Sequence, residues 1–252
     1  MKQALITGTS SGLGQALAAQ LLTSGWRVFG CSRRSAGLDG LQERAVDLAR
    51  PGSIAPMLDD LLDGVDRLEL VVLNAGILGE IRDMSDTPLD AARQVMDINV
   101  WANKVIMDWL HGAGITIRQI VMISSGASVL GNRGWSGYAL SKATLNMLAR
   151  LYSHEFATTH ISALAPGIID TAMMHTLCEA DGAMFPAVER LRQARGTQAM
   201  PDAAGAAQRV IEVLSLLRER PSGSFVDLRE ILDPAGYAAL YGSAASPPLS
   251  TR

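Results

Sequence analysis

Tyr138 and Lys142 are the two side chains of this sequence best suited to proton transfer. They lie four residues apart in the stretch YALSKATLNMLARL, whose helical periodicity places both on one face, one turn apart. A phenol with an ordinary pKa of about 10 is a weak acid at neutral pH, and a neighbouring ammonium group stabilises the phenolate and lowers that pKa. The pair could therefore exchange a proton with a substrate oxygen. The alternative is a buried aromatic ring beside a lysine whose alkyl chain covers apolar surface.

A glycine-rich segment near the start of the chain could bind a phosphate-containing ligand. Residues 7–14 read TGTSSGLG and lie between the apolar run ALI and the helix-like run QALAAQLL. Gly8 permits a tight turn off a strand, Gly12 lets the backbone approach a pyrophosphate, and Gly14 lets a helix pack against a sheet. The helix that begins here offers free N–H groups and a positive dipole to the anion. This placement favours a dinucleotide site over ordinary turn chemistry.

The elements that would position these residues alternate along the chain. Short apolar runs and longer stretches of helical periodicity follow one another, which is typical of βαβ units in a parallel sheet. The pattern predicts strands at 3–7, 27–31, 44–47, 68–73, 118–124, 160–165 and 223–226, and helices at 12–24, 53–62, 89–111, 135–157 and 201–219. We therefore expect an α/β fold, a single doubly wound Rossmann-type domain with a seven-stranded parallel sheet and helices on both faces.

Two segments depart from this rhythm. Residues 167–200 are irregular and rich in methionine, so they are expected to form a lid over the site, with a plain pair of surface helices as the alternative. Residues 1–232 would form the catalytic domain. Residues 233–252 would be a C-terminal tail without a clear element, either loose or an arm on a neighbouring subunit.

Composition and charge narrow the classes of function. Of the 252 residues, 48% are hydrophobic and 19% are charged, which excludes a disordered chain and a disulfide scaffold. The 22 basic and 25 acidic side chains give a net charge of −3 without a basic stripe, so no nucleic-acid partner is expected. No run approaches the ~18 apolar residues of a membrane-spanning helix, so no membrane partner is expected either.

The cysteines and histidines show no ligand pattern. Cys31 and Cys178 are far apart in apolar surroundings, so we expect both to be reduced and inert. The four histidines lack a ligand spacing such as HxxxH, so no metal site is predicted. The chain opens without the charged, apolar and small-residue pattern of a secretory signal, so we expect a cytoplasmic protein.

Four motifs, in this order, resemble those of the short-chain dehydrogenase/reductase family. The glycine turn has the family's spacing TGxxxGxG, which differs from the GxGxxG of most nicotinamide dehydrogenases. The NAG at 74–76 matches the family's NAG motif, YALSK at 138–142 its YxxxK motif, and PGIIDT at 166–171 its PGxxxT motif. The resemblance covers nearly the whole chain and implies hydride transfer between a nicotinamide cofactor and a carbonyl compound.

The resemblance assigns roles to four side chains. Ser125 lies 138 − 125 = 13 positions before Tyr138, the spacing of the family's catalytic serine, and would hold the substrate carbonyl oxygen. Tyr138 would give the proton, and Lys142 would also donate to the nicotinamide ribose. Asn99 resembles the fourth member, which supports a water relay to the lysine; a helix asparagine that makes a local bend is the alternative. Ser124 is interpreted as the end of the preceding strand.

The end of the second strand indicates which nicotinamide cofactor binds. Family members that use NAD carry an acidic residue there, whose carboxylate accepts from the ribose hydroxyls and repels a 2′-phosphate. This chain has Ser32 at that position, followed by Arg33 and Arg34, whose guanidinium groups suit a phosphate. We therefore expect NADP(H); a solvated pair of surface arginines is the alternative.

The resemblance also implies the rest of the cofactor site. Asp47 resembles the family's adenine-contacting aspartate, and a helix cap is its alternative. The expected cofactor-binding residues are Gly8, Ser10, Ser11, Gly12, Leu13, Gly14, Arg33, Arg34, Asp47, Leu48, Asn74, Ala75, Gly76, Tyr138, Lys142, Pro166, Gly167, Ile169 and Thr171.

The sequence around the site is similar to the sepiapterin reductase and benzil reductase branch, which reduces vicinal dicarbonyl groups with NADPH. In sepiapterin reductases the aspartate of a terminal SGxxVD segment anchors the pterin, and the matching residue is Asp227, with a strand-end cap as its alternative. We predict reduction of a ketone or vicinal dicarbonyl, with a sepiapterin-type pterin as the alternative substrate. The expected substrate residues are Ser125, Trp135, Met173 and Asp227, and further wall candidates are Met174, Met184 and Phe185.

Two rival functions and the assembly complete the sequence-based expectations. A catalytically silent NADP(H)-sensing regulator could share the fold, but such proteins usually lose the tyrosine or the lysine. An extended-family epimerase would need a larger C-terminal domain. The helices at 89–111 and 135–157 carry more apolar residues than one sheet-facing stripe requires, so we expect a homodimer and consider a homotetramer.

Overall fold

A parallel sheet of seven strands forms the centre of the computed structural model, which describes residues 1–242. The strand order is β3-β2-β1-β5-β7-β8-β9, and every neighbouring pair is parallel. The strands are β1 Gln3–Thr7, β2 Arg27–Ser32, β3 Gln42–Ala45, β5 Leu70–Leu73, β7 Gln119–Ile123, β8 His160–Ala165 and β9 Ser224–Asp227. A two-stranded ladder joins β4 Arg67–Leu68 to β6 Thr116–Ile117. The predicted doubly wound fold is confirmed.

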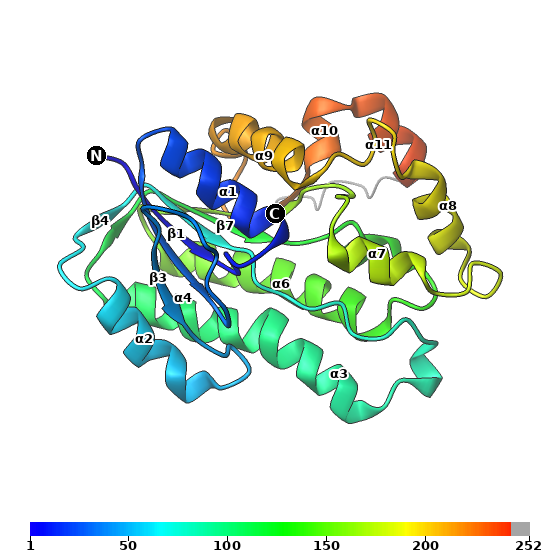
Figure 1. Ribbon diagram of the computed structural model, residues 1–252, viewed down its shortest axis with the longest axis horizontal. Coiled ribbons are helices and arrows are strands. Elements are labelled where there is room, and N and C mark those ends of the chain that lie inside the picture. Colours follow the sequence, from blue (N-terminus) through cyan, green and yellow to red (C-terminus); the bar gives the residue numbers. More distant parts are fainter. Residues whose placement is uncertain (243–252) are drawn as a thin grey trace.

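Helices cover both faces of this sheet (Figure 1). On one face lie α1 Gly12–Thr23 and α9 Ala203–Leu217, whose apolar stripes share a core with one side of the strands. On the other face lie α2 Ile54–Leu61, α4 Ala102–Gly112 and α6 Ser136–Glu155, which bury a second core. Because both faces are covered, the strands read as continuous apolar runs, such as the fully buried LVVL of β5.

Several expected boundaries moved, and two of these changes are informative. The strand expected at 44–47 is β3 at Gln42–Ala45, an edge strand with three exposed residues, so no buried alternation marks its register. The helix expected at 89–111 is α3 Leu89–Met96, then a π-helical turn at Asp97–Trp101, then α4. Such turns inside helices are frequent at functional sites.

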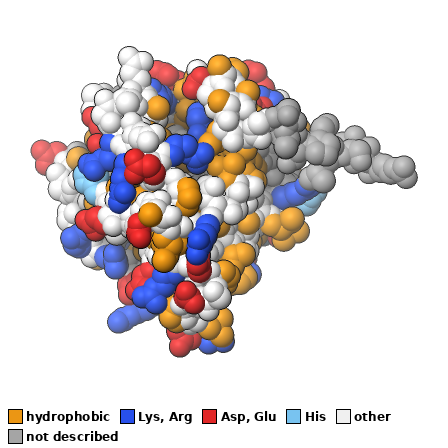
Figure 2. All heavy atoms as spheres, turned by 90° about the vertical axis from the view of Figure 1, so that its right-hand side faces the viewer, with side chains coloured by type: hydrophobic (Ala, Val, Ile, Leu, Met, Phe, Trp, Pro, Cys, Tyr) orange, Lys and Arg blue, Asp and Glu red, His pale blue; other side chains and the backbone are white. Residues whose placement is uncertain are grey.

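The segment expected to be a lid contains α7 Ala172–Cys178 and α8 Pro186–Ala194 (Figure 1). Leu177 and Leu191 from these helices pack with Leu78 in a small third core. Figure 2 views this end of the molecule and shows hydrophobic side chains exposed among charged ones.

The C-terminal stretch corrects one expectation. Residues 233–252 were expected to lack a clear element, but α11 spans Pro234–Tyr241 and follows α10 Leu228–Leu232. Asp233 accepts a hydrogen bond from the backbone N–H of Gly236 and so caps α11, a signal that the sequence carried. The part of the expected tail at 243–252 lies outside the described residues.

Candidate active site

A cavity of about 370 Å³ opens at the carboxyl ends of the strands. It begins where β1 and β5 lie side by side and the chain winds away in opposite directions, which is where ligands bind in doubly wound sheets. Most of the predicted site residues line it. They are Gly8, Ser10, Ser11, Gly12, Leu13, Arg33, Arg34, Asp47, Leu48, Asn74, Ala75, Gly76, Ser125, Trp135, Tyr138, Lys142, Pro166, Gly167, Ile169, Thr171 and Met173.

Apart from two candidates for the apolar wall, which are described below, three predicted residues do not line the cavity among the residues described. They are Gly14, Asn99 and Asp227. A Cβ on Gly14 would lie 2.3 Å from the carbonyl oxygen of Gly8, so glycine is needed where α1 packs against the turn that follows β1. Asn99 and Asp227 make internal contacts, which are described below.

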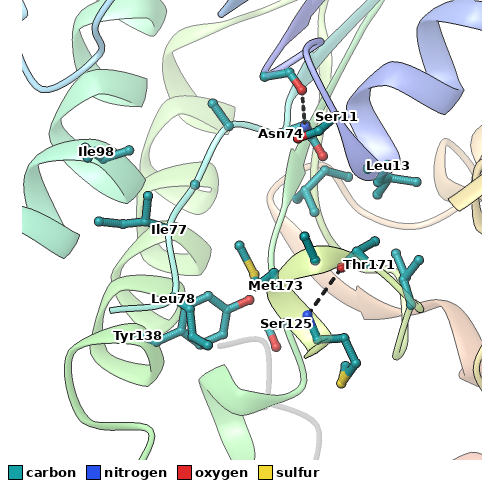
Figure 3. A pocket seen from close by; sticks show the side chains of 18 of the residues that line it. Ser11, Leu13, Asn74, Ile77, Leu78, Ile98, Ser125, Tyr138, Thr171 and Met173 are labelled. Carbon is teal, nitrogen blue, oxygen red and sulfur yellow. Dashed lines mark hydrogen bonds between the residues drawn. The ribbon is translucent and has the colours of Figure 1, made fainter. Parts of the chain in front are cut away.

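The glycine turn leaves room for a dinucleotide. Gly8 adopts φ +76°, and a Cβ on it would lie 2.9 Å from the Cα of Ala75, so only glycine fits where the turn meets the strand-end loop of β5. The first turn of α1 carries no acidic residue, and the side chain of its N-cap, Ser11, makes no capping bond. The free N–H groups at this helix start suit a pyrophosphate. Figure 3 shows Ser11 and Leu13 at this end of the cavity.

The two arginines after β2 are available to an anion. Arg33 and Arg34 are exposed at the cavity rim, and neither forms an ion pair within residues 1–242. The hydroxyl of Ser32 donates to the carbonyl oxygen of Arg34 at 2.5 Å and shapes this turn. Asp47 also lines the cavity, and its Oδ1 accepts from the N–H of Ala49 at 3.1 Å, which is a local turn bond and not a helix cap.

Ser125, Tyr138 and Lys142 meet at the other end of the cavity. Ser125 lies two residues after the end of β7, and Tyr138 and Lys142 lie one turn apart on α6. Figure 3 shows the Tyr138 hydroxyl pointing into the cavity on the side of Ser125. The Lys142 Nζ is buried, donates to the carbonyl oxygen of Ile123 at 2.7 Å, and lies 5.7 Å from the centroid of the Tyr138 ring.

Burial is the main cause of the pKa shifts of Tyr138 and Lys142. Burial raises the pKa of Tyr138, and its hydrogen bond with Ser125 lowers that pKa by a smaller amount. The ammonium of Lys142, which was expected to lower the pKa of Tyr138, donates here to the Ile123 carbonyl. Burial also lowers the pKa of Lys142 from 10.5 to about 8, so the group still carries its proton at pH 7.

Asn99 braces the loop beside these residues. It lies in the π-helical turn, and its Oδ1 accepts from the N–H of Ile77 at 2.8 Å, while its Nδ2 donates to the Ile77 carbonyl at 2.9 Å and to Ser141 Oγ at 2.9 Å. A Cβ on Gly76 would lie 3.1 Å from Asn99 Oδ1 and 3.6 Å from Lys142 Nζ. Asn99 therefore holds the 74–77 loop next to the lysine.

The apolar wall of the cavity differs in part from the expected one. Trp135, Met173 and Met174 line it, as do Leu78 and Leu177, which the sequence reasoning missed because their apolar periodicity reads as ordinary core. Met184 and Phe185 do not line it, so those two candidates are wrong. Met184 is 49% exposed, whereas Phe185 is buried against the glycine at position 134, where a Cβ would lie 2.6 Å from its ring.

Asp227 is not placed to anchor a substrate. Its carboxylate is fully buried, with Oδ1 accepting from Arg229 N at 3.0 Å and Arg229 Nε at 2.9 Å, and Oδ2 accepting from Arg229 Nη2 at 2.6 Å and Tyr241 Oη at 2.7 Å. These contacts occupy the oxygens that a pterin would need. The expectation of a pterin anchor is therefore corrected, and the strand-end cap that was its alternative is observed.

Cys31 and Cys178 are buried free thiols, and burial raises the pKa of Cys31 to about 12, so its thiolate is disfavoured. Within the described part of the chain, no three His, Cys, Asp or Glu side chains are grouped to hold a metal ion. Across the same residues, no helix is both long enough and apolar enough to cross a membrane.

Comparison with known proteins agrees with this geometry. The family model for short chain dehydrogenase matches residues 2–182. A benzil reductase ((S)-benzoin forming) of Bacillus subtilis (strain 168) is 28% identical over 249 residues, which cover 92% of this chain and 100% of the relative. A benzil reductase ((S)-benzoin forming) of Saccharomyces cerevisiae is 29% identical over 224 residues, which cover 80% of this chain and 85% of the relative.

Solved structures share the fold. A short chain dehydrogenase/reductase from Saccharomyces cerevisiae superposes with a TM-score of 0.80 at 21% identity, covering 92% of this chain and 98% of the other. The structure of a levodione reductase gives a TM-score of 0.75 at 22% identity, covering 90% and 94%.

Proposed function

The chain belongs to the short-chain dehydrogenase family and is an oxidoreductase, and from this we propose that it reduces a ketone or vicinal dicarbonyl with NADPH, using Tyr138 as proton donor. One observation carries the proposal. A single cavity has Ser125, Tyr138 and Lys142 at one end, and the glycine turn with the pair Arg33-Arg34 at the other. This arrangement would bring a proton donor and a bound dinucleotide to the same substrate.

The side chains divide the chemistry between them. When bound, the nicotinamide supplies a hydride to the carbonyl carbon. Ser125 Oγ and Tyr138 Oη donate hydrogen bonds to the carbonyl oxygen and stabilise the negative charge that develops there. Tyr138 Oη then transfers its proton to that oxygen. Lys142, as a cation, stabilises the phenolate that remains and favours the transfer.

The choice of NADPH is supported by the charges at the rim of the cavity. Arg33 and Arg34 bring two guanidinium groups to the end of β2, where no carboxylate replaces Ser32. The glycine turn, Asp47, the 74–76 loop and Thr171 would hold the rest of the dinucleotide.

The substrate class is supported by the relatives and by the cavity wall. Two matched relatives are benzil reductases, and the wall around Tyr138 is formed by Leu78, Trp135, Met173 and Leu177. An apolar wall suits a substrate with aryl or alkyl groups beside its carbonyls. A pterin is not retained as the alternative substrate, because that alternative depended on Asp227 as the anchor of the pterin ring. The silent-regulator alternative is disfavoured because the serine, tyrosine and lysine lie together.

The lid, the assembly and the compartment complete the proposal. Residues 167–200 cover the cavity through α7, which contributes Met173, Met174 and Leu177 to its wall. A homodimer is favoured by large hydrophobic side chains left exposed near the start of α4 and on α6, among them Trp101, Met147 and Leu151. Two buried free thiols fit a reducing compartment such as the cytoplasm.

The direct test is cofactor oxidation against a small substrate panel. NADPH and NADH should each be tried with benzil, sepiapterin, a monoketone and a β-ketoacyl thioester. We expect NADPH-dependent turnover of benzil, with a lower kcat/KM for the monoketone. Turnover of none of the four, or a clear preference for NADH, would contradict the proposal.

A further inference from the structure

The loop that carries Ser125 is held by contacts within itself. Ser125 lies between β7 and the short helix α5 Ala127–Leu130. Its carbonyl oxygen accepts from Ser128 Oγ at 2.6 Å and from Ser128 N at 3.0 Å, and its Oγ accepts from the N–H of Ala127 at 3.2 Å. The Ser125 hydroxyl is therefore placed by the conformation of residues 124–128, and whatever holds Ser124 and Ser128 also holds Ser125.

Asn146 makes that connection from the catalytic helix. It follows Lys142 by four residues and Tyr138 by eight, so all three lie on one face of α6. Its Oδ1 accepts from Ser124 Oγ at 2.5 Å, and its Nδ2 donates to Ser128 Oγ at 2.9 Å. One amide thus joins both ends of the loop.

The hydrogen bonds with Ser124 and Ser128 require an amide at position 146. The single hydroxyl proton of Ser128 is already donated to the Ser125 carbonyl, so Ser128 Oγ can only accept from its other neighbour. The hydroxyl of Ser124 donates to Asn146 Oδ1 at 2.5 Å, a much shorter contact than the 3.5 Å to its other acceptor, the Lys142 carbonyl. Asparagine supplies a donor and an acceptor on one planar group, whereas aspartate supplies acceptors alone and leucine supplies neither.

We propose that Asn146 is a positioning residue for carbonyl reduction. Through Ser124 and Ser128 it fixes the position of the Ser125 side chain relative to Tyr138. This inference rests on the proposed function. Asn146 does not line the cavity among the described residues, so it acts without touching substrate. Because α6 also carries Tyr138 and Lys142, one rigid helix sets the positions of all three catalytic side chains. A displacement of about 1 Å at such a site can cost up to ~100-fold in rate.

The test compares four variants of the full chain. Asn146→Ala removes both bonds, and Asn146→Asp keeps the acceptor but would draw the Ser128 proton away from the Ser125 carbonyl. Ser128→Ala breaks the same chain at its other end. Thr144→Ala is the matched control, since that hydroxyl on α6 donates only to the carbonyl of Leu140 in its own helix.

We expect the first three variants to lower kcat with benzil by about 10- to 100-fold, with the NADPH Kd changed less than about twofold. The double variant Asn146→Ala/Ser128→Ala should be no worse than the poorer single one, because the two residues act through one chain. In alcohol oxidation, the pH at which the rate is half-maximal should rise, because Tyr138 loses the bond with Ser125 that lowers its pKa. Thr144→Ala should match the wild type in every measurement.

A readout without turnover separates this inference from the proposed function. Hydrogen–deuterium exchange of the peptide 124–130 should be faster in Asn146→Ala, Asn146→Asp and Ser128→Ala than in the wild type and Thr144→Ala. If the wild type reduces none of the substrates, the proposed function fails. The exchange of peptide 124–130 in the variants still shows whether Asn146 holds the loop. Unchanged exchange, or a fully folded Asn146→Ala protein with wild-type kcat and pH profile, would overturn the positioning role.

Discussion

Replacing Lys142 with methionine should make the protein more stable at neutral pH while it inactivates the site. Lys142 is 4% exposed, and burial lowers its pKa from 10.5 to about 8. Each pKa unit corresponds to ~1.4 kcal/mol, so keeping this cation in the folded state costs about 3 kcal/mol at pH 7. The hydrogen bond from its Nζ to the Ile123 carbonyl offsets about 1 kcal/mol of this cost. Lys142→Met should therefore raise the free energy of unfolding at pH 7 by about 2 kcal/mol.

The pH dependence of this gain follows from the direction of the shift. Between pH 8 and pH 10.5 the unfolded chain keeps the lysine proton and the folded chain loses it, so raising the pH stabilises the wild type through this group. Below about pH 8 the penalty is present in full. The advantage of Lys142→Met should therefore be largest at pH 7 and disappear near pH 10.

Thermal and urea unfolding of cofactor-free protein between pH 7 and pH 10 would measure this effect. At pH 7 the Tm of Lys142→Met should exceed that of the wild type by roughly 4–8 °C. Lys104→Met is the matched control, because Lys104 is half-exposed and its ion pair with Asp108 is worth little. A Lys142→Met protein less stable than the wild type at pH 7 would refute the reasoning. So would an advantage that does not change with pH, because methionine packing alone would then explain it.

Three further predictions concern Arg33, Asp227 and the assembly. Arg33→Ala should weaken NADPH binding by about 1 to 3 kcal/mol and leave NADH binding nearly unchanged, measured by fluorescence titration; equal losses would place Arg33 away from the 2′-phosphate. Asp227→Asn removes the charge that pairs with the partly exposed Arg229, so it should lower the free energy of unfolding by about 2 kcal/mol in urea titrations. It should reduce kcat/KM for benzil and for sepiapterin in parallel. A loss confined to sepiapterin would restore Asp227 as a pterin anchor. Light scattering at micromolar concentration should give a mass near twice 26.8 kDa, and a monomer mass would exclude the dimer.

The sequence predicted the fold, and it predicted the cavity residues whose role depends only on their immediate neighbours in the chain. A glycine at a strand-to-helix turn, or two side chains one turn apart on a helix, needs only the immediate neighbours to be interpreted. Gly8, Tyr138 and Lys142 are of this kind, and the structure brings all three to one cavity.

What the sequence did not predict depends on contacts between distant segments. The carboxylate of Asp227 could bind a ligand or an internal partner, and the choice is decided by Tyr241, on a helix that was not expected. Likewise, the spacing of Tyr138 and Lys142 does not reveal that the Ile123 carbonyl holds the ammonium. Phe185 resembled a pocket wall by composition, but its ring fills the space left open by a glycine 51 residues earlier in the chain (185 − 134 = 51).

The central claim is that Tyr138 gives the proton in an NADPH-dependent carbonyl reduction, and Tyr138→Phe tests it most directly. Only the hydroxyl is deleted, so the ring should still pack against Trp135, at 6.1 Å between ring centroids, and NADPH should still bind. Benzil reduction should be measured under saturating NADPH, together with the NADPH Kd of the same preparation. The account predicts a loss of kcat of about 100-fold or more with the Kd unchanged. Activity within a few-fold of the wild type would show that Tyr138 is not the acid.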